Sequence, residues 1–251
     1  MGKPCAFCAI GKEESGTPSE RKLRKEHLIK ILELAAADSK ILNINLTGGN
    51  TFKPDRGAYQ YLPYIKAIRG KNKIVPIAIE ITPPEISASR EVFENLKNAG
   101  ATGIVINIEF WNDEIRERLM PIKGKFTKEE YFTAYKNAVA VFGKNKVVSG
   151  IIVGVEPLSE TYKAITAMAE IDVIPETYPF KPNDGSLMEG YLKTPLDTVI
   201  IASLLANSEI QKHDFDVKQS AGCIKCGACG LTQQLADIKF DVDFNSIRES
   251  E

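Results

Sequence analysis

The chain has 251 residues and a formal net charge of −1. That length suits one large α/β domain or a barrel, and the balanced charge gives no basic surplus for nucleic acid or an anionic membrane. No apolar run approaches the roughly 18 residues of a membrane span, and the N-terminus lacks the basic-then-apolar layout of a secretion signal. We therefore expect a cytoplasmic protein without nucleic-acid or membrane partners. In that setting clustered cysteines are metal ligands or redox groups rather than disulfides.

Strand and helix patterns alternate along the chain. Thr17–Glu20 is a capping box for a first helix with apolar residues on one face. Apolar, β-branched runs then predict five strands: residues 41–49, 73–84, 102–110, 146–154 and 172–180. Amphipathic segments predict the helices that separate and follow these strands: residues 59–68, 87–100, 113–120, 127–142, 159–171 and 194–206.

Capping residues mark several helix boundaries. Asn112 precedes the short helix at 113–120 and is expected to cap it. Thr127 and Glu130 form a second capping box, for the helix at 127–142, and Gly100 closes the helix at 87–100.

Strands separated by helices, without a repeat in the sequence itself, predict a parallel sheet with right-handed crossovers. A doubly wound sheet and a partial (β/α) barrel both fit, because hydrophobic periodicity does not separate them. In either case functional groups belong at the C-terminal ends of the strands. Polar, glycine or proline residues follow each predicted strand, in the segments LTGGN, EITPP, NIEF, VGVEP and YPFKPNDG.

Cys5 and Cys8 form a CxxC pattern before the first helix, and Gly48 and Gly49 end the first predicted strand. This order resembles the radical SAM superfamily, in which a CxxxCxxC loop binds a [4Fe–4S] cluster together with S-adenosylmethionine. The resemblance implies that both cysteines ligate this cluster and that Phe7 is the aromatic residue before the last cysteine. It also implies that the backbone of Gly48 and Gly49 meets the methionine amino group of the cosubstrate.

Within the superfamily, the strand ends are most similar to the biotin synthase and lipoyl synthase group. Asn107 and Glu109 match an Asn-x-acid pair near the ribose of the cosubstrate, and VVSGIIVGVEP, with Gly154 and Glu156, resembles a strand beside the adenine. Glu80 faces the same way and joins this cofactor-binding set. Structural alternatives stay open for each of these residues. Gly48 and Gly49 would then only form a turn, and Asn107 and Glu109 would be a polar pair without a ligand. Glu80 would be a buried acid paired with a lysine, and Glu156 an acid that favours a helix start.

The resemblance implies a partial (β/α)6 TIM-like barrel over residues 1–206 and a cysteine-bearing tail over residues 207–251. The CxxxCxxC pattern requires a cysteine where Met1 stands, and the barrel strand that should precede the loop is missing. We therefore expect the true start to lie upstream, and the chain as written to be inactive.

A second cysteine cluster, GCIKCGACG, places Cys223, Cys226 and Cys229 in a CxxCxxC run with glycines between them. Such spacing lets thiolates converge from a tight loop, as in ferredoxin-type clusters. The resemblance implies an auxiliary [4Fe–4S] cluster held by these three thiolates. The alternative is structural zinc, with Cys5 and Cys8 joined by two of the tail cysteines.

The resemblance implies an enzyme that generates a 5′-deoxyadenosyl radical and inserts sulfur at an unactivated carbon, as lipoyl synthase does. Its partners would be S-adenosylmethionine, an electron donor of ferredoxin or flavodoxin type, a related radical SAM subunit and an acylated carrier protein. Two alternatives are a radical SAM enzyme of another cofactor-biosynthesis reaction, with an electron-transfer auxiliary cluster, and a catalytically silent barrel subunit stabilised by zinc.

Overall fold

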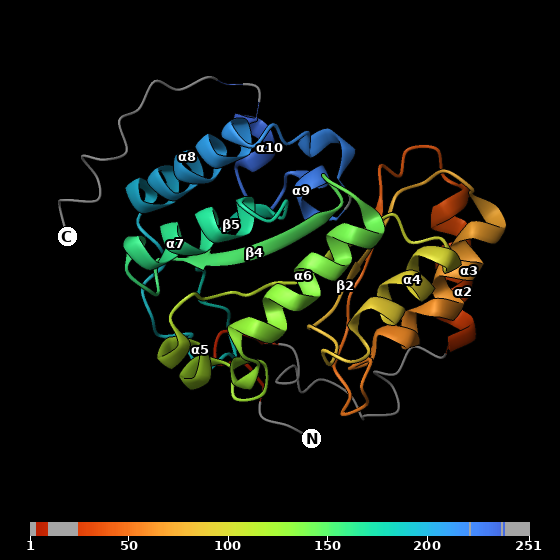
Figure 1. Ribbon diagram of the computed structural model, residues 1–251, viewed down its shortest axis with the longest axis horizontal. Coiled ribbons are helices and arrows are strands. Elements are labelled where there is room, and N and C mark those ends of the chain that lie inside the picture. The colour runs from red at the N-terminus through yellow and green to blue at the C-terminus, as the bar shows by residue number, and fades with distance from the viewer. Residues whose placement is uncertain (1–3, 10–24, 221, 237, 239–251) are drawn as a thin grey trace.

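A computed structural model describes residues 4–9, 25–220, 222–236 and 238 of the chain (Figure 1). Its sheet has five parallel strands that lie side by side in chain order. Because the strand order never reverses, the sheet lacks the switch point of a doubly wound fold, and the partial barrel is confirmed. The sheet is open among the described residues, with β1 and β5 at its edges. The strands are β1 (Ile44–Leu46), β2 (Ile77–Glu80), β3 (Gly103–Val105), β4 (Val147–Val153) and β5 (Ile174–Pro179).

Helices cover the outer face of this sheet (Figure 1). The longer ones are α2 (Lys25–Ala37), α3 (Leu62–Lys71), α4 (Ser89–Ala99), α6 (Lys128–Phe142), α7 (Leu158–Ala169) and α8 (Leu196–Lys212). The short elements are α5 (Asp113–Leu119), α9 (Cys223–Cys226), α10 (Thr232–Leu235) and the 3-10 turns η1 (Ala58–Tyr61), η2 (Lys123–Lys125) and η3 (Val217–Gln219). None of the described helices is long and apolar enough to cross a membrane.

Alternate side chains of each strand point to opposite faces of the sheet. Ile77, Ile79 and Ile104 point outward and belong to the main core under the helices. Ala78 and Val105 point inward and belong to a second, smaller apolar cluster. The inner face therefore carries its own set of side chains, which pack separately from the main core.

The observed strands are shorter than the apolar runs that predict them. In the run 102–110, ladder pairing covers only Gly103–Val105, and Glu109 then makes an isolated bridge to Ile151. Apolar runs overestimate strand length here because the chain stays buried after the ladder ends, and burial alone selects apolar residues.

The predicted caps are confirmed where the structure describes them. The Asn112 side chain accepts a hydrogen bond from the amide of Ile115, and Thr127 with Glu130 forms the reciprocal capping box of α6. Gly100 ends α4 with a left-handed φ of 114°. The capping box at Thr17–Glu20 lies outside the described residues.

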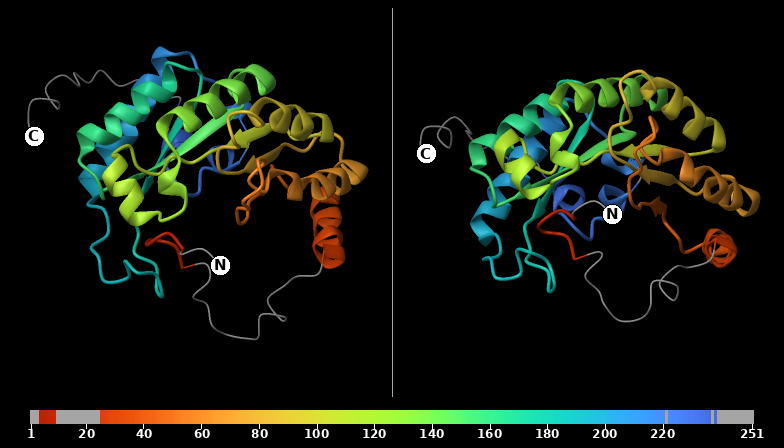
Figure 2. Two further views of the ribbon diagram at one scale, coloured as in Figure 1. Left: turned by 60° about the horizontal axis from the view of Figure 1, so that its bottom comes forward. Right: turned by 90° about the horizontal axis from the view of Figure 1, so that it is seen from below.

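The C-terminal segment folds back against the inner face of the sheet. Its Val217 and Ile224 pack in the apolar cluster that contains Ala78 and Val105. Gly222 lies so close that an added Cβ would be 3.1 Å from the Val105 Cγ2 atom, so glycine permits this approach. The tail and residues 4–9 lie on the same concave side of the sheet (Figure 2). The expected boundary after residue 206 falls within α8, which continues to residue 212.

Candidate functional site

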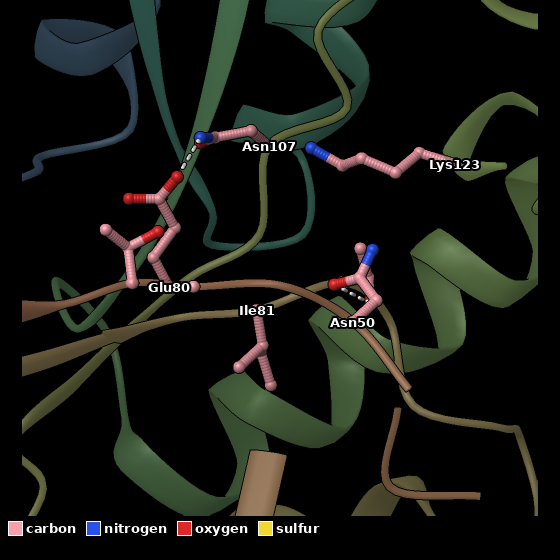
Figure 3. A pocket seen from close by; sticks show the side chains of 8 residues that line it. Asn50, Glu80, Ile81, Asn107 and Lys123 are labelled. Atoms are coloured by element: carbon pink, nitrogen blue, oxygen red, sulfur yellow. Dashed lines mark hydrogen bonds between the residues drawn. The ribbon is translucent and has the colours of Figure 1, made fainter. Parts of the chain in front are cut away.

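A row of hydrogen-bonded polar side chains crosses the inner face from β1 to β4. Asn45 Nδ2 donates to Glu80 Oε2 at 3.1 Å. Asn107 Nδ2 donates to Glu80 Oε1 at 3.0 Å (Figure 3). The backbone amide of Gly150 donates to Asn107 Oδ1 at 2.9 Å, which fixes the orientation of that amide group. Burial raises the pKa of the Glu80 carboxyl.

Glu176 and Tyr178 extend this polar row onto β5. Glu176 is only 1% exposed, and its Oε2 atom accepts a 2.5 Å hydrogen bond from the Tyr178 hydroxyl. Burial raises the pKa of Glu176 to about 7, with a smaller contribution from the charge on Glu80. Gly150 makes room for the row, because an added Cβ would lie 2.5 Å from the Tyr178 ring and 2.8 Å from Asn107 Oδ1. Neither Glu176 nor Tyr178 was predicted from the sequence.

Glu109 and Lys123 form an ion pair above this row. Glu109 is 8% exposed and has a left-handed φ of 67°, which is costly for a residue other than glycine. Lys123 Nζ donates to Glu109 Oε1 at 3.1 Å. Burial acts to lower the pKa of Lys123, but the charge on Glu109 outweighs it and raises that pKa. Gly124 allows η2 to sit against α5, since an added Cβ would lie 2.2 Å from the Arg116 carbonyl oxygen.

A pocket of about 80 Å³ opens over the polar row (Figure 3). It brings together three residues predicted from separate strand ends, Gly48, Glu80 and Asn107, and adds Lys123, which the sequence analysis missed. Gly49 does not line it and has open space around its Cα atom. The full lining is Thr47, Gly48, Asn50, Glu80, Ile81, Thr82, Asn107 and Lys123.

The loop that carries Cys5 and Cys8 lies at the C-terminal end of the sheet. The amide of Cys8 donates to the carbonyl oxygen of Cys5 at 3.0 Å, so the two residues share one turn. Phe7, between them, contacts Phe110 edge-to-face at 5.7 Å between ring centroids. Burial raises the pKa of the Cys5 thiol to about 11, although the nearby cation of Lys123 acts in the opposite direction.

A second pocket, of about 410 Å³, adjoins this loop. Its wall includes Gly154, whose φ is 93° and whose Cα faces the Thr194 hydroxyl, 2.5 Å from where a Cβ would stand. The amide of Ala6 donates to the Leu119 carbonyl oxygen at 2.7 Å, which joins the cysteine loop to the same wall. The lining is mainly apolar: Arg118, Leu119, Gly154, Val155, Phe180, Met188, Tyr191 and Leu192.

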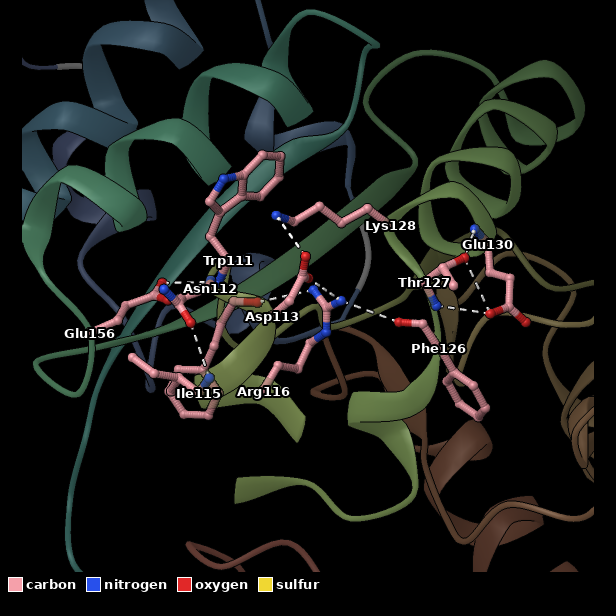
Figure 4. A network of polar contacts seen from close by, with 11 residues as sticks. Trp111, Asn112, Asp113, Ile115, Arg116, Phe126, Thr127, Lys128, Glu130 and Glu156 are labelled. Carbon is pink, nitrogen blue, oxygen red and sulfur yellow. Dashed lines mark hydrogen bonds and ion pairs between the residues drawn. The ribbon is translucent and has the colours of Figure 1, made fainter. Parts of the chain in front are cut away.

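Glu156 lines neither of these two pockets. Its carboxylate accepts hydrogen bonds of 3.0 Å from the backbone amides of Trp111 and Asn112 (Figure 4). It thereby joins the segment after β4 to Asn112, the N-cap residue of α5. In this structure Glu156 supports the backbone beside the pocket.

The tail cysteines lie in the segment that folds against the inner face, with Cys223 near Glu176 and Glu80. Cys223 is partly buried, whereas Cys226 and Cys229 are exposed. Burial, followed by the charge on Glu176, raises the pKa of Cys223 to about 12. Among the described residues, no three side chains of His, Cys, Asp or Glu are placed to hold one metal ion.

The cysteine side chains of both segments are suitable ligands for an iron–sulfur cluster, since thiolates are the usual protein ligands of such clusters. Around the first loop, however, the described residues supply two thiols, those of Cys5 and Cys8. Cys5 packs with Phe110 and Leu119, whereas Ile224, between two tail cysteines, packs with Val105. The two cysteine groups therefore belong to different clusters of the fold, which disfavours one shared zinc site.

The fold and the cysteine loop together define the class of protein. The family model of the Radical SAM superfamily matches residues 2–166. The chain therefore belongs to the radical SAM superfamily, whose members are enzymes that use S-adenosylmethionine, a [4Fe–4S] cluster and a reductant.

Solved structures show the same fold. The chain is similar to the [FeFe]-hydrogenase maturase HydG from Carboxydothermus hydrogenoformans, with a TM-score of 0.62 and 18% identity over 84% of this chain and 49% of that one. A second HydG structure matches with a TM-score of 0.58 and 15% identity over 86% of this chain and 47% of that one. The chain thus spans about half the length of both. No curated protein sequence matches it. The superfamily is confirmed, but the biotin synthase and lipoyl synthase group is not.

Proposed function

We propose that this protein uses radical SAM chemistry to abstract a hydrogen atom from a polar substrate held on the inner face of the partial barrel. The observation that carries this proposal is the polar row of Asn45, Glu80, Asn107, Glu176 and Tyr178, which lies between the two cysteine-bearing segments. When bound, the cluster and S-adenosylmethionine supply the 5′-deoxyadenosyl radical. The chain's own residues bind the cosubstrate, orient the substrate and exclude water.

The first cysteine loop would hold the cluster. Cys5 and Cys8 would ligate two of its irons, and the contact between Phe7 and Phe110 would fix the loop at the end of the sheet. A cluster of this family needs a third thiolate, which the described residues of the loop do not contain. The sequence-based expectation of an upstream cysteine stays a prediction.

The two pockets suit the two ends of S-adenosylmethionine. Lys123 would bind the methionine carboxylate, because a buried ammonium is a strong donor to an anion. The backbone at Gly48 would meet the amino group, and the larger apolar pocket at Gly154 and Phe180 would take the adenine. Glu109 keeps Lys123 charged and in place.

The polar row argues against an alkyl chain as the group that lies across it. An octanoyl chain there would bury apolar carbons against the carboxyl groups of Glu80 and Glu176 without supplying any hydrogen-bond donor or charge, which is costly. Sulfur insertion is the second candidate, and it is favoured by the partly buried thiol of Cys223 beside Glu176. The donor of ferredoxin or flavodoxin type, the related subunit and the carrier protein stay expectations.

The test replaces Lys123 with Met and, as the matched control, the exposed Lys125 of the same turn with Met. Equilibrium dialysis of the anaerobically reconstituted full chain measures affinity for S-adenosylmethionine. Loss of a hydrogen bond to a charged group, about 1.5–3 kcal/mol, predicts binding weaker by roughly 10- to 150-fold in K123M. K125M should bind like the wild type, and equal binding by K123M would contradict the proposal.

Formation of 5′-deoxyadenosine is assayed in parallel, both in this chain and in a form extended by its upstream reading frame. Loss of sulfide during turnover from a cluster that the tail cysteines would hold would favour sulfur insertion over other radical reactions. Turnover with no loss of sulfide would exclude it.

A further inference from the structure

Each side-chain donor group of the polar row already makes a hydrogen bond to an acid of the same row. Both amide groups that face Glu80, those of Asn45 and Asn107, donate to its carboxylate. The Tyr178 hydroxyl donates to Glu176. The cation that lines the pocket, Lys123, is paired with Glu109. Within the part of the chain that the structure describes, the five residues of the row carry no cation, and each of their donor groups is directed at an acid of the row.

Acceptors, by contrast, remain open. The Oδ1 atom of Asn45 is buried, and no described residue donates to it. Glu176 is 1% exposed, and the described residues give it one hydrogen bond, on Oε2. Its Oε1 atom faces the tail loop, 3.6 Å from where a Cβ on Gly230 would stand. A buried acceptor without a donor is unfavourable unless a ligand donates a hydrogen bond to it. Two buried carboxyl groups of like charge are unfavourable unless a ligand supplies a positive charge.

We infer that Glu80 and Glu176 bind a cationic group of the substrate, a primary ammonium or an amidinium, with Asn45 as an additional acceptor. Such a group brings two or more N–H donors for the open acceptors and a positive charge for the two acids. A hydroxyl brings one donor and no charge, and a carboxylate or phosphate would be repelled. This inference rests on the proposed function, because it names the class of substrate that the inner face of the partial barrel would hold.

Two rival roles for these acids are distinguishable by experiment. Glu80 also lines the pocket that contains Gly48, so it could serve the ammonium of S-adenosylmethionine instead of the substrate. Glu176 lies near the Cys223 thiol, so it could serve as a ligand of an auxiliary cluster. The first rival predicts that the cosubstrate displaces a cationic probe, and the second predicts that loss of Glu176 lowers the iron content.

The experiment uses two matched pairs of probes, benzylamine with benzyl alcohol and benzamidine with benzamide. Saturation-transfer NMR measures their binding to the anaerobically reconstituted full chain in the presence of saturating S-adenosylmethionine. We expect each cationic member to bind at least about tenfold more tightly than its neutral partner. The variants E80Q and E176Q should each reduce that preference about tenfold. E94Q, which alters an exposed acid of α4 paired with Arg90, is the control and should leave the preference unchanged.

The inference is overturned if the neutral probes bind equally well, if S-adenosylmethionine displaces the cationic probes, or if E176Q loses iron. It is also overturned if the preference persists in both E80Q and E176Q. Circular dichroism checks that the variants fold, and the two positions give independent tests if one variant does not. Probe discrimination in a protein that fails to bind S-adenosylmethionine would refute the proposed function while leaving the cation site supported. Binding of S-adenosylmethionine without discrimination between the probes would refute the cation site while leaving the proposed function supported.

Discussion

Glu176 should make the stability of the folded chain fall as the pH rises. Burial raises its pKa to about 7, from an ordinary value of 4.5, so the folded protein favours the protonated carboxyl. Its contribution to stability is therefore fully present below pH 4.5, the unfolded value, and is lost as the pH rises through the folded value near 7. At about 1.36 kcal/mol per pH unit, the loss amounts to about 3 kcal/mol.

The variant E176Q isolates this effect. Glutamine keeps the size of the side chain and an oxygen that accepts from the Tyr178 hydroxyl, but it does not ionise. The free energy of unfolding of E176Q, relative to the wild type, should therefore increase by about 3 kcal/mol between pH 4.5 and pH 8.5. Urea unfolding followed by the fluorescence of the single tryptophan, Trp111, measures both proteins across this range.

The control is E94Q, because Glu94 belongs to an exposed ion pair whose contribution to stability is small. Its pH profile should run parallel to that of the wild type. If the E176Q profile is also parallel to the wild type, the carboxyl of Glu176 is not buried in a low-dielectric site and the reasoning about the polar row is wrong.

Three further predictions concern packing, the polar row and the tail. Gly124→Ala should lower the free energy of unfolding by about 1–3 kcal/mol, because its methyl group would collide with α5; urea unfolding measures this, and an unchanged midpoint would contradict the close packing. Asn107→Ala should cost about 1–3 kcal/mol in the same assay, because it leaves the backbone amide of Gly150 without an acceptor and removes one of the two amide donors to Glu80, whereas a loss below about 0.5 kcal/mol would show that water replaces it. Replacing Cys223, Cys226 and Cys229 with Ala should remove one cluster's worth of iron after anaerobic reconstitution, and unchanged iron content would remove the tail from the metal chemistry.

The helices and strands could be predicted well because hydrophobic period and capping are local properties. The caps at Asn112 and Thr127 were identified from short motifs, and the structure confirms both. The strand ends were predicted less well. Residues 106–109 follow β3 as a buried segment outside the ladder, and buried strands and buried irregular segments have the same apolar composition.

The pocket could be predicted in part, from the rule that polar residues at the ends of parallel strands converge. Gly48, Glu80 and Asn107 were selected in this way, and the structure places them around one pocket. Lys123 could not be predicted as a pocket residue, because it lies on a short turn after α5 and the sequence around it resembles many exposed segments that contain lysine. The one local signal was the glycine that follows it, Gly124, which the packing against α5 requires.

Glu176 was missed for a different reason. Its run, DVIPETYPF, predicts a strand, and a strand prediction alone does not say which face an acidic residue takes. Only the closeness of the tail, which approaches Glu176 at Gly230, makes that face the interior of the protein. Contacts between segments far apart in sequence decide burial here, and they are not encoded in any local pattern.

The inner face contains backbone strain and buried acids that lower the stability of the folded protein, and this favours a ligand-binding role over a structural one. Glu109 holds a left-handed backbone conformation that costs of order 1–3 kcal/mol, and it does so where its carboxylate meets Lys123. Glu80 and Glu176 are buried acids with raised pKa values, and hydrophobic residues of similar size would fill the same space more favourably. The small apolar cluster beneath them, with Ala78 and Val105, shows that this face can be filled in that way. Strain and buried charge therefore concentrate in the layer where the cosubstrate and substrate are proposed to meet.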